Sequence, residues 1–246
     1  GFIGPTGSVE MDRAWHPSWI YYAVVLGSSA VVVLVWRRGE GDDIDAAIMF
    51  CDLRGSTRLE EELGRQDYIK LLNSFFDVAS GIVHDNGGEV LKFIGDAVLA
   101  VFPAGDDPEQ ARELALASAR SIAPALQAIA QEYETGSLEC ASGIAFGTVT
   151  YGNVGSRERL DFTVIGQAAN VAARLGDYGK SLGHSILVSK NSLPSGTEAI
   201  ALGALDLHNV SAKVESFAVS PFLQAPAPRQ EPETVGSAPV VRLTKD

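Results

Sequence analysis

Two short apolar runs around a tight turn constrain the fold of this chain more than any other feature. Glu89–Phe93 and Ala97–Phe102 have the length of strands, and Ile94-Gly95-Asp96 between them is typical of a β-hairpin turn. A hairpin pairs successive strands antiparallel, whereas a doubly wound parallel sheet needs a crossover between them. The pattern therefore argues against a doubly wound fold.

The remaining apolar runs predict further strands and helices. Strands are expected over Ala46–Asp52, Leu138–Thr150, Phe162–Ile165, Ser185–Ser189 and Glu215–Val219, the last of them at a sheet edge. Helices are expected after the capping-box pattern of Thr57 and Glu60 as far as Asn86, over residues 109–132, and over Ala168–Leu175. Pro124 should kink or divide the second helix. This mixed order predicts an α+β sandwich, in which helices cover a sheet with antiparallel strands.

Charge and cysteine content exclude several classes of protein. The 246-residue chain has a net charge of −12, and residues 39–222 alone carry −13. Such a field repels nucleic-acid phosphates, so we expect no nucleic-acid partner. Cys51 and Cys140 lie far apart in sequence, without a CxxC or a neighbouring His cluster. They are expected to be reduced core residues in a cytosolic setting, not a disulfide or a zinc site.

The segment from Ala14 to Trp36 contains no charged residue, and Arg37-Arg38 follow it. Residues 19–36 would span about 27 Å as a helix, close to a hydrocarbon core of about 30 Å, with aromatic residues at both ends. We expect a single transmembrane helix here, with the following domain in the cytoplasm. The alternative is a buried strand or core helix in a cytoplasmic protein. The predicted organisation is an N-terminal segment (1–18), the membrane helix (19–36), a linker (37–43), a main domain (44–222) and a Pro-rich disordered tail (223–246).

Two aspartates are predicted at strand ends. Asp52 ends an apolar run and Asp96 lies at the hairpin tip. Mg²⁺ binds one or two carboxylates together with substrate phosphates, so the pair is a candidate metal site. The alternative is two turn aspartates. Leu53-Arg54-Gly55-Ser56-Thr57 after Asp52 joins a glycine to a helix start, which suits a phosphate group, although a plain helix cap explains it equally.

Asn170 and Arg174 are four residues apart on a predicted helix and therefore share one face. A guanidinium can stabilise charge that develops on a phosphoryl group. The alternative is a surface Arg on an alanine-rich helix.

Four blocks in order resemble the motifs of class III nucleotidyl cyclases. They are Phe50–Thr57, Gly88–Phe102, Gly143–Gly147 with Gly152–Gly155, and Phe162–Leu175. The resemblance covers Ile44 to Phe222. It implies a ferredoxin-like (βαββαβ) α+β catalytic domain that acts as a homodimer, with two Mg²⁺ or Mn²⁺ ions at each site.

The resemblance also implies a role for individual residues. Asp52 and Asp96 match the metal-binding aspartates, Lys92 and Thr163 the base-selecting pair, and Asn170 and Arg174 the ribose-orienting and transition-state residues. Leu53, Gly55, Ser56 and Thr57 match the loop that binds substrate phosphates. The Lys/Thr pair is similar to that of a bacterial adenylate cyclase subgroup and implies ATP as the substrate. The resemblance to the family implies that the metal residues and the base residues of one site come from different protomers. With the transmembrane helix expected over residues 19–36, the predicted function is membrane-tethered synthesis of cyclic AMP.

The chain departs from the family at two positions. His208-Asn209 replaces a basic step that binds triphosphate, with Lys213 downstream, and Thr148 stands where many relatives have Arg. A weak or inactive domain that regulates a partner cyclase is therefore an alternative, and so is a guanylate cyclase. A diguanylate cyclase is a third, since Gly87-Gly88-Glu89 resembles the GGDEF motif, but Asp96 and the Asn170/Arg174 block do not fit it.

Overall fold

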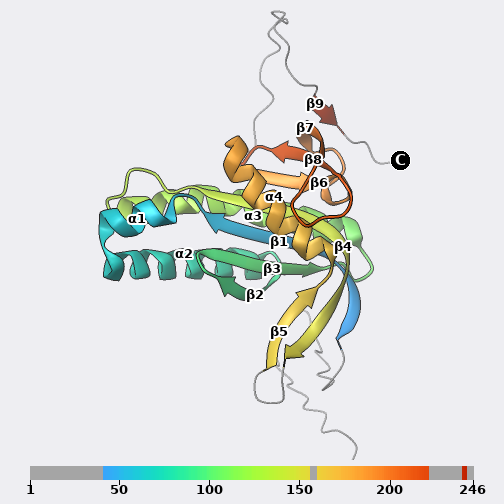
Figure 1. Ribbon diagram of the computed structural model, residues 1–246, viewed down its shortest axis with the longest axis horizontal. Helices are drawn as coiled ribbons and strands as arrows, with labels where there is room; N and C mark the ends of the chain where they lie inside the picture. The colour runs from blue at the N-terminus through green and yellow to red at the C-terminus, as the bar shows by residue number, and fades with distance from the viewer. Residues whose placement is uncertain (1–40, 156–159, 222–239, 243–246) are drawn as a thin grey trace, which may run out of the picture. The chain divides into compact units, whose positions relative to one another are not determined.

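A computed structural model of the chain describes residues 41–155, 160–221 and 240–242 (Figure 1). All predicted strands are present. They are β1 (Asp42–Leu53), β2 (Glu89–Ile94), β3 (Ala97–Pro103), β4 (Cys140–Gly155), β5 (Leu160–Ile165), β6 (Ile186–Ser189) and β8 (Val214–Val219). Two strands were not predicted, β7 (Glu198–Leu205) and β9 (Val240–Arg242). Strand β9 lies in the segment predicted to be a disordered tail, and β1 begins within the predicted linker.

The strands form one sheet with the order β2-β3-β1-β4-β6-β8-β7-β9, and β5 pairs with β4. With α1 and α2 taken as one helical segment, the elements up to β4 follow the order βαββαβ, which agrees with the predicted ferredoxin-like α+β arrangement. Strand β8 lies between β6 and β7, so the prediction that it is an edge strand is wrong. The reason is the unpredicted β7, which pairs with the edge of β8 that does not face β6.

The helices differ from the predicted ones at their ends. The first predicted helix is divided at Gly64 (φ 78°) into α1 (Ser56–Leu63) and α2 (Arg65–Asp85). Gly55, in a left-handed conformation, precedes α1 without a side-chain cap, so the predicted capping box is wrong. Helix α3 (Pro108–Glu132) runs through Pro124 and is not divided there. A helix α4 (Gln167–Leu182) and a 3₁₀ turn, η1 (Lys190–Ser192), complete the set within the residues described.

Side-chain parity along β1 separates two hydrophobic layers. Ala47, Met49, Cys51 and Leu53 pack in the layer that includes α2 and α3. Ala46 and Ile48 pack in the other layer, with Ala168, Val171, Ala172 and Leu175 of α4. Because alternate residues of a strand point to opposite faces, Asp52 belongs to the α4 face.

Both cysteines are buried and free, as the sequence predicted. They lie on adjacent strands, since β1 and β4 are paired at Leu53 and Cys140. A hydrogen bond with Cys140 and burial together raise the pKa of the Cys51 thiol well above its usual range. The interpretation of the pair as reduced core residues agrees with this environment.

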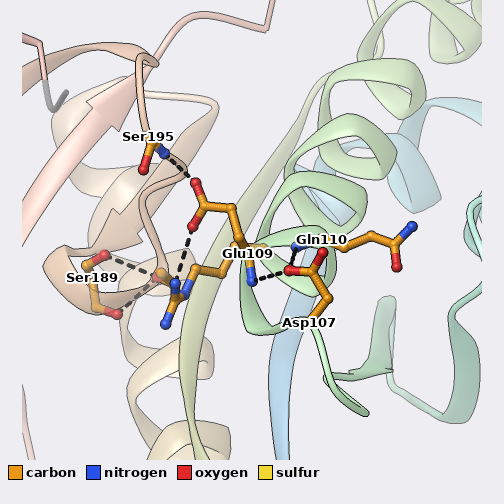
Figure 2. A network of polar contacts seen from close by, with 7 residues as sticks. Asp107, Glu109, Gln110, Ser189 and Ser195 are labelled. Carbon is orange, nitrogen blue, oxygen red and sulfur yellow. Dashed lines mark hydrogen bonds and ion pairs between the residues drawn. The ribbon is translucent and has the colours of Figure 1, made fainter. Parts of the chain in front are cut away.

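The start of α3 is fixed to the loop that follows β6 (Figure 2). Asp107 caps α3 by accepting from the amides of Glu109 and Gln110, both at 3.1 Å. The Glu109 carboxylate accepts from the Ser195 amide at 2.6 Å and from Arg112 at 3.1 Å. The guanidinium of Arg112 also lies over the Phe146 ring, 4.3 Å from its centre. This network therefore joins α3 to the face of β4 that packs in the layer of α2 and α3.

Helix α4 lies unusually close to β4 at Gly143. A Cβ atom added there would lie 2.0 Å from the Ala172 carbonyl oxygen and 2.4 Å from the Gly176 nitrogen. Both are backbone atoms of α4, so a side chain at this position would push the helix away from the sheet. The glycine therefore sets the separation of helix and sheet.

We expect Gly143→Ala to destabilise the domain by about 3 kcal/mol, the upper end of typical overpacking costs. The melting temperature should fall by roughly 6–12 °C for a domain of this size. Gly147→Ala is the matched control, since its Cβ would make only an ordinary 3.5 Å contact with the Ala168 side chain. Thermal melts followed by circular dichroism measure both, and equal melting temperatures for the two variants would contradict the prediction.

Among the residues that the structure describes, no helix is long and apolar enough to cross a bilayer. The span predicted over residues 19–36 lies outside the described residues.

Candidate functional site

Asp52 and Asp96 lie together at one end of the sheet, as the sequence predicted. The register pairs Asp52 with Ala97, and the Leu53 amide donates to the Asp96 carbonyl over 3.4 Å. Asp52 is only 8% exposed. One of its carboxylate oxygens, Oδ2, accepts a hydrogen bond from Lys180 of α4, whereas the other, Oδ1, is buried without a partner.

The Asp52 carboxylate is suited to a metal ion. Burial raises its pKa, the hydrogen bond from Lys180 lowers it, and the negative charge of Asp96 raises it again. A buried oxygen without a partner is costly, and a divalent cation beside two carboxylates would supply the missing interaction. In the described part of the chain, no group of three or more His, Cys, Asp or Glu residues is placed to hold a metal ion. The residues present therefore fit Mg²⁺ or Mn²⁺, which need few protein ligands.

The predicted phosphate loop follows Asp52 directly. Gly55 (φ 69°) turns the chain into α1, and the amides of the first turn of a helix have no acceptor within it. Gly55 and Thr57 are exposed and Ser56 is partly so, which leaves this helix start accessible to an anion. Leu53 differs, because its side chain is fully buried in the core and its amide bonds to Asp96. In this structure Leu53 anchors the start of the predicted phosphate loop to the core.

Two further residues at this site were not predicted. Tyr68 of α2 is close enough to Asp96 for that charge, after burial, to raise the pKa of its hydroxyl. The sequence predicted only that Tyr68 belongs to the helix that ends at Asn86. Lys180 was not singled out because a lysine in the last turn of a helix is common, where it favours the helix dipole. Nothing local in the sequence indicates that it meets Asp52.

The two residues predicted to select the base, Lys92 and Thr163, lie elsewhere, on β2 and β5. Figure 1 shows β5 and the end of β4 extending beyond the rest of the sheet. The Lys92 ammonium pairs with Asp161 of β5 at 2.5 Å, and the Tyr151 hydroxyl donates to Glu89, so two polar contacts join this extension to β2. Thr163 is two residues beyond Asp161, on the same face of β5. The structure thus brings Lys92 to the strand that carries Thr163, and it adds Asp161, which the sequence did not indicate.

Asn170 and Arg174 lie on α4, as predicted. Asn170 is exposed, and Arg174 pairs with Asp177 one turn further on, at 3.1 Å. Within the described chain, no hydrogen bond or ion pair joins either residue to Asp52 or Asp96. Arg174 precedes Lys180 by six residues, which rotates it by roughly 120° around the helix axis. Arg174 therefore points in a different direction from Lys180, the residue of α4 that contacts Asp52.

A cavity of about 350 Å³ opens beside the first turn of α4. Gln167, Thr148, Asn191 and Lys213 contribute polar side chains to its lining. The Thr148 hydroxyl is already engaged, because it donates to Asp45 at 2.6 Å. His208 is exposed in a turn and does not line this cavity, whereas Lys213 does.

The comparisons with known proteins agree with the sequence motifs. A family model described as "Adenylate and Guanylate cyclase catalytic domain" matches residues 42–219. The Mycobacterium tuberculosis protein Rv1319c is 37% identical over 158 residues, which is 64% of this chain and 29% of that protein. The chain therefore spans less than a third of the length of this curated relative.

Solved structures of both substrate types are similar. The adenylyl cyclase CyaB from P. aeruginosa has a TM-score of 0.64 and 26% identity, over 74% of this chain and 96% of that one. The guanylyl cyclase Cya2 has a TM-score of 0.64 and 27% identity, over 74% and 94%. Fold similarity alone therefore does not distinguish the two nucleotides.

Proposed function

Because the chain belongs to the family of adenylate and guanylate cyclase catalytic domains, we propose that it converts ATP to 3′,5′-cyclic AMP and pyrophosphate as a homodimer. The observation that carries the proposal is the Asp52 carboxylate, with a buried oxygen lacking a partner, beside Asp96 and an uncapped helix start. In this reaction the ribose 3′-oxygen bonds to the α-phosphorus and loses its proton. The bond from the α-phosphorus to the bridging oxygen breaks, and pyrophosphate leaves with that oxygen.

Each group of residues has a distinct task in this proposal. Bound metal ions would lower the pKa of the 3′-hydroxyl and neutralise the triphosphate, and Asp52 and Asp96 would hold them. The amides at Ser56 and Thr57 bind phosphate oxygens. Arg174 donates to the α-phosphate as its charge rises, and Asn170 orients the ribose.

Base selection is proposed from hydrogen-bonding capacity. The Lys92 ammonium donates to adenine N1 and the Thr163 hydroxyl accepts from the N6 amine, whereas guanine presents a donor at N1 and an acceptor at O6. Asp161 is an acidic group beside Lys92, but it is neutralised by that lysine. The arrangement favours adenine, and guanylate cyclase activity is the alternative.

The test is a product assay on the full chain with ATP or GTP and either Mn²⁺ or Mg²⁺. Cyclic AMP should form from ATP faster than cyclic GMP forms from GTP at equal nucleotide concentration. GTP turnover equal to or above ATP turnover would overturn the base assignment. No product with either nucleotide would overturn the enzymatic proposal itself.

Replacing the base-selecting lysine should change substrate preference. In Lys92→Glu, we expect the ratio of kcat/KM for ATP to that for GTP to fall at least about tenfold, since a hydrogen bond from a charged group is worth about 1.5–3 kcal/mol. Lys70→Glu is the control, because Lys70 is exposed and pairs only with the surface residue Asp67. An unchanged ratio in Lys92→Glu would exclude Lys92 from base selection.

A regulatory domain that pairs with another cyclase is the second candidate, and His208 in place of a basic residue favours it. Lys213 at the cavity beside α4 offers an alternative cation and supports catalysis instead. An activity assay distinguishes the regulatory domain from a catalytic homodimer. A homodimer that is inactive alone, but becomes active when a second cyclase chain is added, would identify the regulatory domain.

The membrane tether is proposed from residues 19–36 and the two arginines after them. It would place the catalytic domain at the cytoplasmic side of the cell membrane, where it would act in intracellular signalling. Full-length protein should then remain in the membrane pellet after a carbonate wash. Recovery in the supernatant would contradict the tether and leave the catalytic proposal intact.

A further inference from the structure

Lys180 contacts the carboxylate of Asp52, a residue far from it in sequence. It lies 128 residues from Asp52, and its ammonium donates to the Oδ2 atom of that residue. The Lys180 side chain is 32% exposed, against 12% for that of Asp52, so the ammonium remains partly in solvent. A metal ion bound at Asp52 would repel this ammonium, because both are cations competing for one carboxylate.

The backbone that carries Lys180 is fixed to the predicted phosphate loop. Arg54, two residues after Asp52, donates from Nη2 to the carbonyls of Gly179 at 3.2 Å and His184 at 2.6 Å. These carbonyls lie on either side of the helix end, where Gly183 (φ 76°) terminates α4. Arg54 therefore holds the end of α4 against the loop, while the long Lys180 stem keeps its own rotational freedom.

The loop has a shortage of available positive charge. Arg54 is its only basic residue, and its guanidinium is turned to α4 and to Glu139, at 3.9 Å. A triphosphate bound at the start of α1 would bring several negative charges close to two carboxylates. An ammonium that leaves Asp52 on metal binding would be available to offset them.

We propose that Lys180 is a substrate-binding residue that exchanges partners. It neutralises Asp52 before metal binds, and it donates to the phosphate chain of the nucleotide once a divalent cation has taken its place at the carboxylate. The proposal deepens the nucleotide cyclase function and rests on it for the identity of the ligand. It assigns a role to a residue outside the motifs that identify the family here.

Two binding measurements on the full chain test the exchange without reference to turnover. Mn²⁺ binding without nucleotide is followed by the electron paramagnetic resonance signal of the free ion. Lys180→Met should bind Mn²⁺ more tightly, by up to about fivefold, since the competing ion pair is worth at most about 1 kcal/mol. Pyrophosphate binding at saturating Mn²⁺, measured by calorimetry, should weaken about tenfold, because a charge-assisted hydrogen bond is lost.

Matched variants separate this role from a structural one. Lys190→Met removes a more exposed lysine that pairs with Glu215 and not with Asp52, and it should change neither affinity. Lys180→Arg should retain pyrophosphate binding, and Lys180→Gln repeats the main test with a polar side chain. Unchanged or weaker Mn²⁺ binding in both Lys180→Met and Lys180→Gln would overturn the proposal, and so would unchanged pyrophosphate affinity. If the Lys180 variants show both binding effects but the wild-type chain forms no cyclic nucleotide, the reaction is rejected and the exchange of partners by Lys180 is not.

Discussion

Asp52→Asn is expected to reduce kcat/KM for ATP by about 10³ or more, because metal ions contribute several kcal/mol of transition-state stabilisation and each 1.4 kcal/mol is a factor of ten. The substitution keeps the shape of the side chain but removes the charge that binds the cation. Lys180 loses its partner, yet it is exposed enough to be solvated. The folded state should therefore persist, and steady-state kinetics with circular dichroism show both results.

Asp45→Asn is the control for this experiment. Asp45 lies on the same strand, is exposed, and accepts a hydrogen bond from Thr148 at the opposite end of β1. Its loss should leave kcat/KM within a factor of about three, since exposed polar contacts contribute little. If Asp52→Asn retained activity similar to Asp45→Asn, the assignment of the metal site would be wrong. Mn²⁺ binding should also be lost only in Asp52→Asn.

Mixing two inactive variants is expected to restore activity. Arg174→Ala alone should lower kcat by about 10²–10³, the typical effect of removing a donor to developing charge. Asp52→Asn is inactive for a different reason. If each site takes its metal residues from one chain and Arg174 from the other, a mixed dimer contains one site with no substitution.

The size of the recovery follows from statistics. Random reassortment of equal amounts gives half mixed dimers, each with one intact site of two, so about a quarter of the wild-type rate should return. Native mass spectrometry confirms that mixed dimers are present. No recovery in their presence would show that Asp52 and Arg174 act within one chain. Arg174 pairs with Asp177 and points in a different direction from Lys180, which contacts Asp52, and this leads us to expect recovery.

Much of the fold could be predicted because its signals are local. The hairpin at Gly95 and Asp96, the apolar run ending at Asp52 and the helix carrying Asn170 all depend on neighbouring residues. Strand β7 was missed because its sequence, EAIALGAL, has no clear alternation of apolar and polar residues. Its strand state depends on pairing with β8 and β9.

The candidate site was predicted less completely, for a related reason. Asp52 and Asp96 were both recognised, since each lies at the end of a locally predictable element. Lys180 and Asp161 were not, because the sequence does not show that β5 reaches Lys92 of β2 or that α4 reaches Asp52 of β1. The capping box at Thr57 failed because the N-cap of α1 is Gly55, so the helix begins at Ser56, before Thr57. Such contacts follow only from the completed sheet.

The pairing of β1 with both β3 and β4 has a consequence for the order in which the domain folds. The β2–β3 hairpin, with Asp96 at its tip, closes a short loop and can form early. Asp52 acquires its environment only when β4 and α4 dock, and its contact with Lys180 spans 128 residues. Segments this far apart in the chain are expected to meet late in folding, because closing a long loop costs conformational entropy before the new contacts lower the free energy. A refolding experiment should therefore show hairpin structure before Mn²⁺ affinity, with the metal reporting the final step of folding.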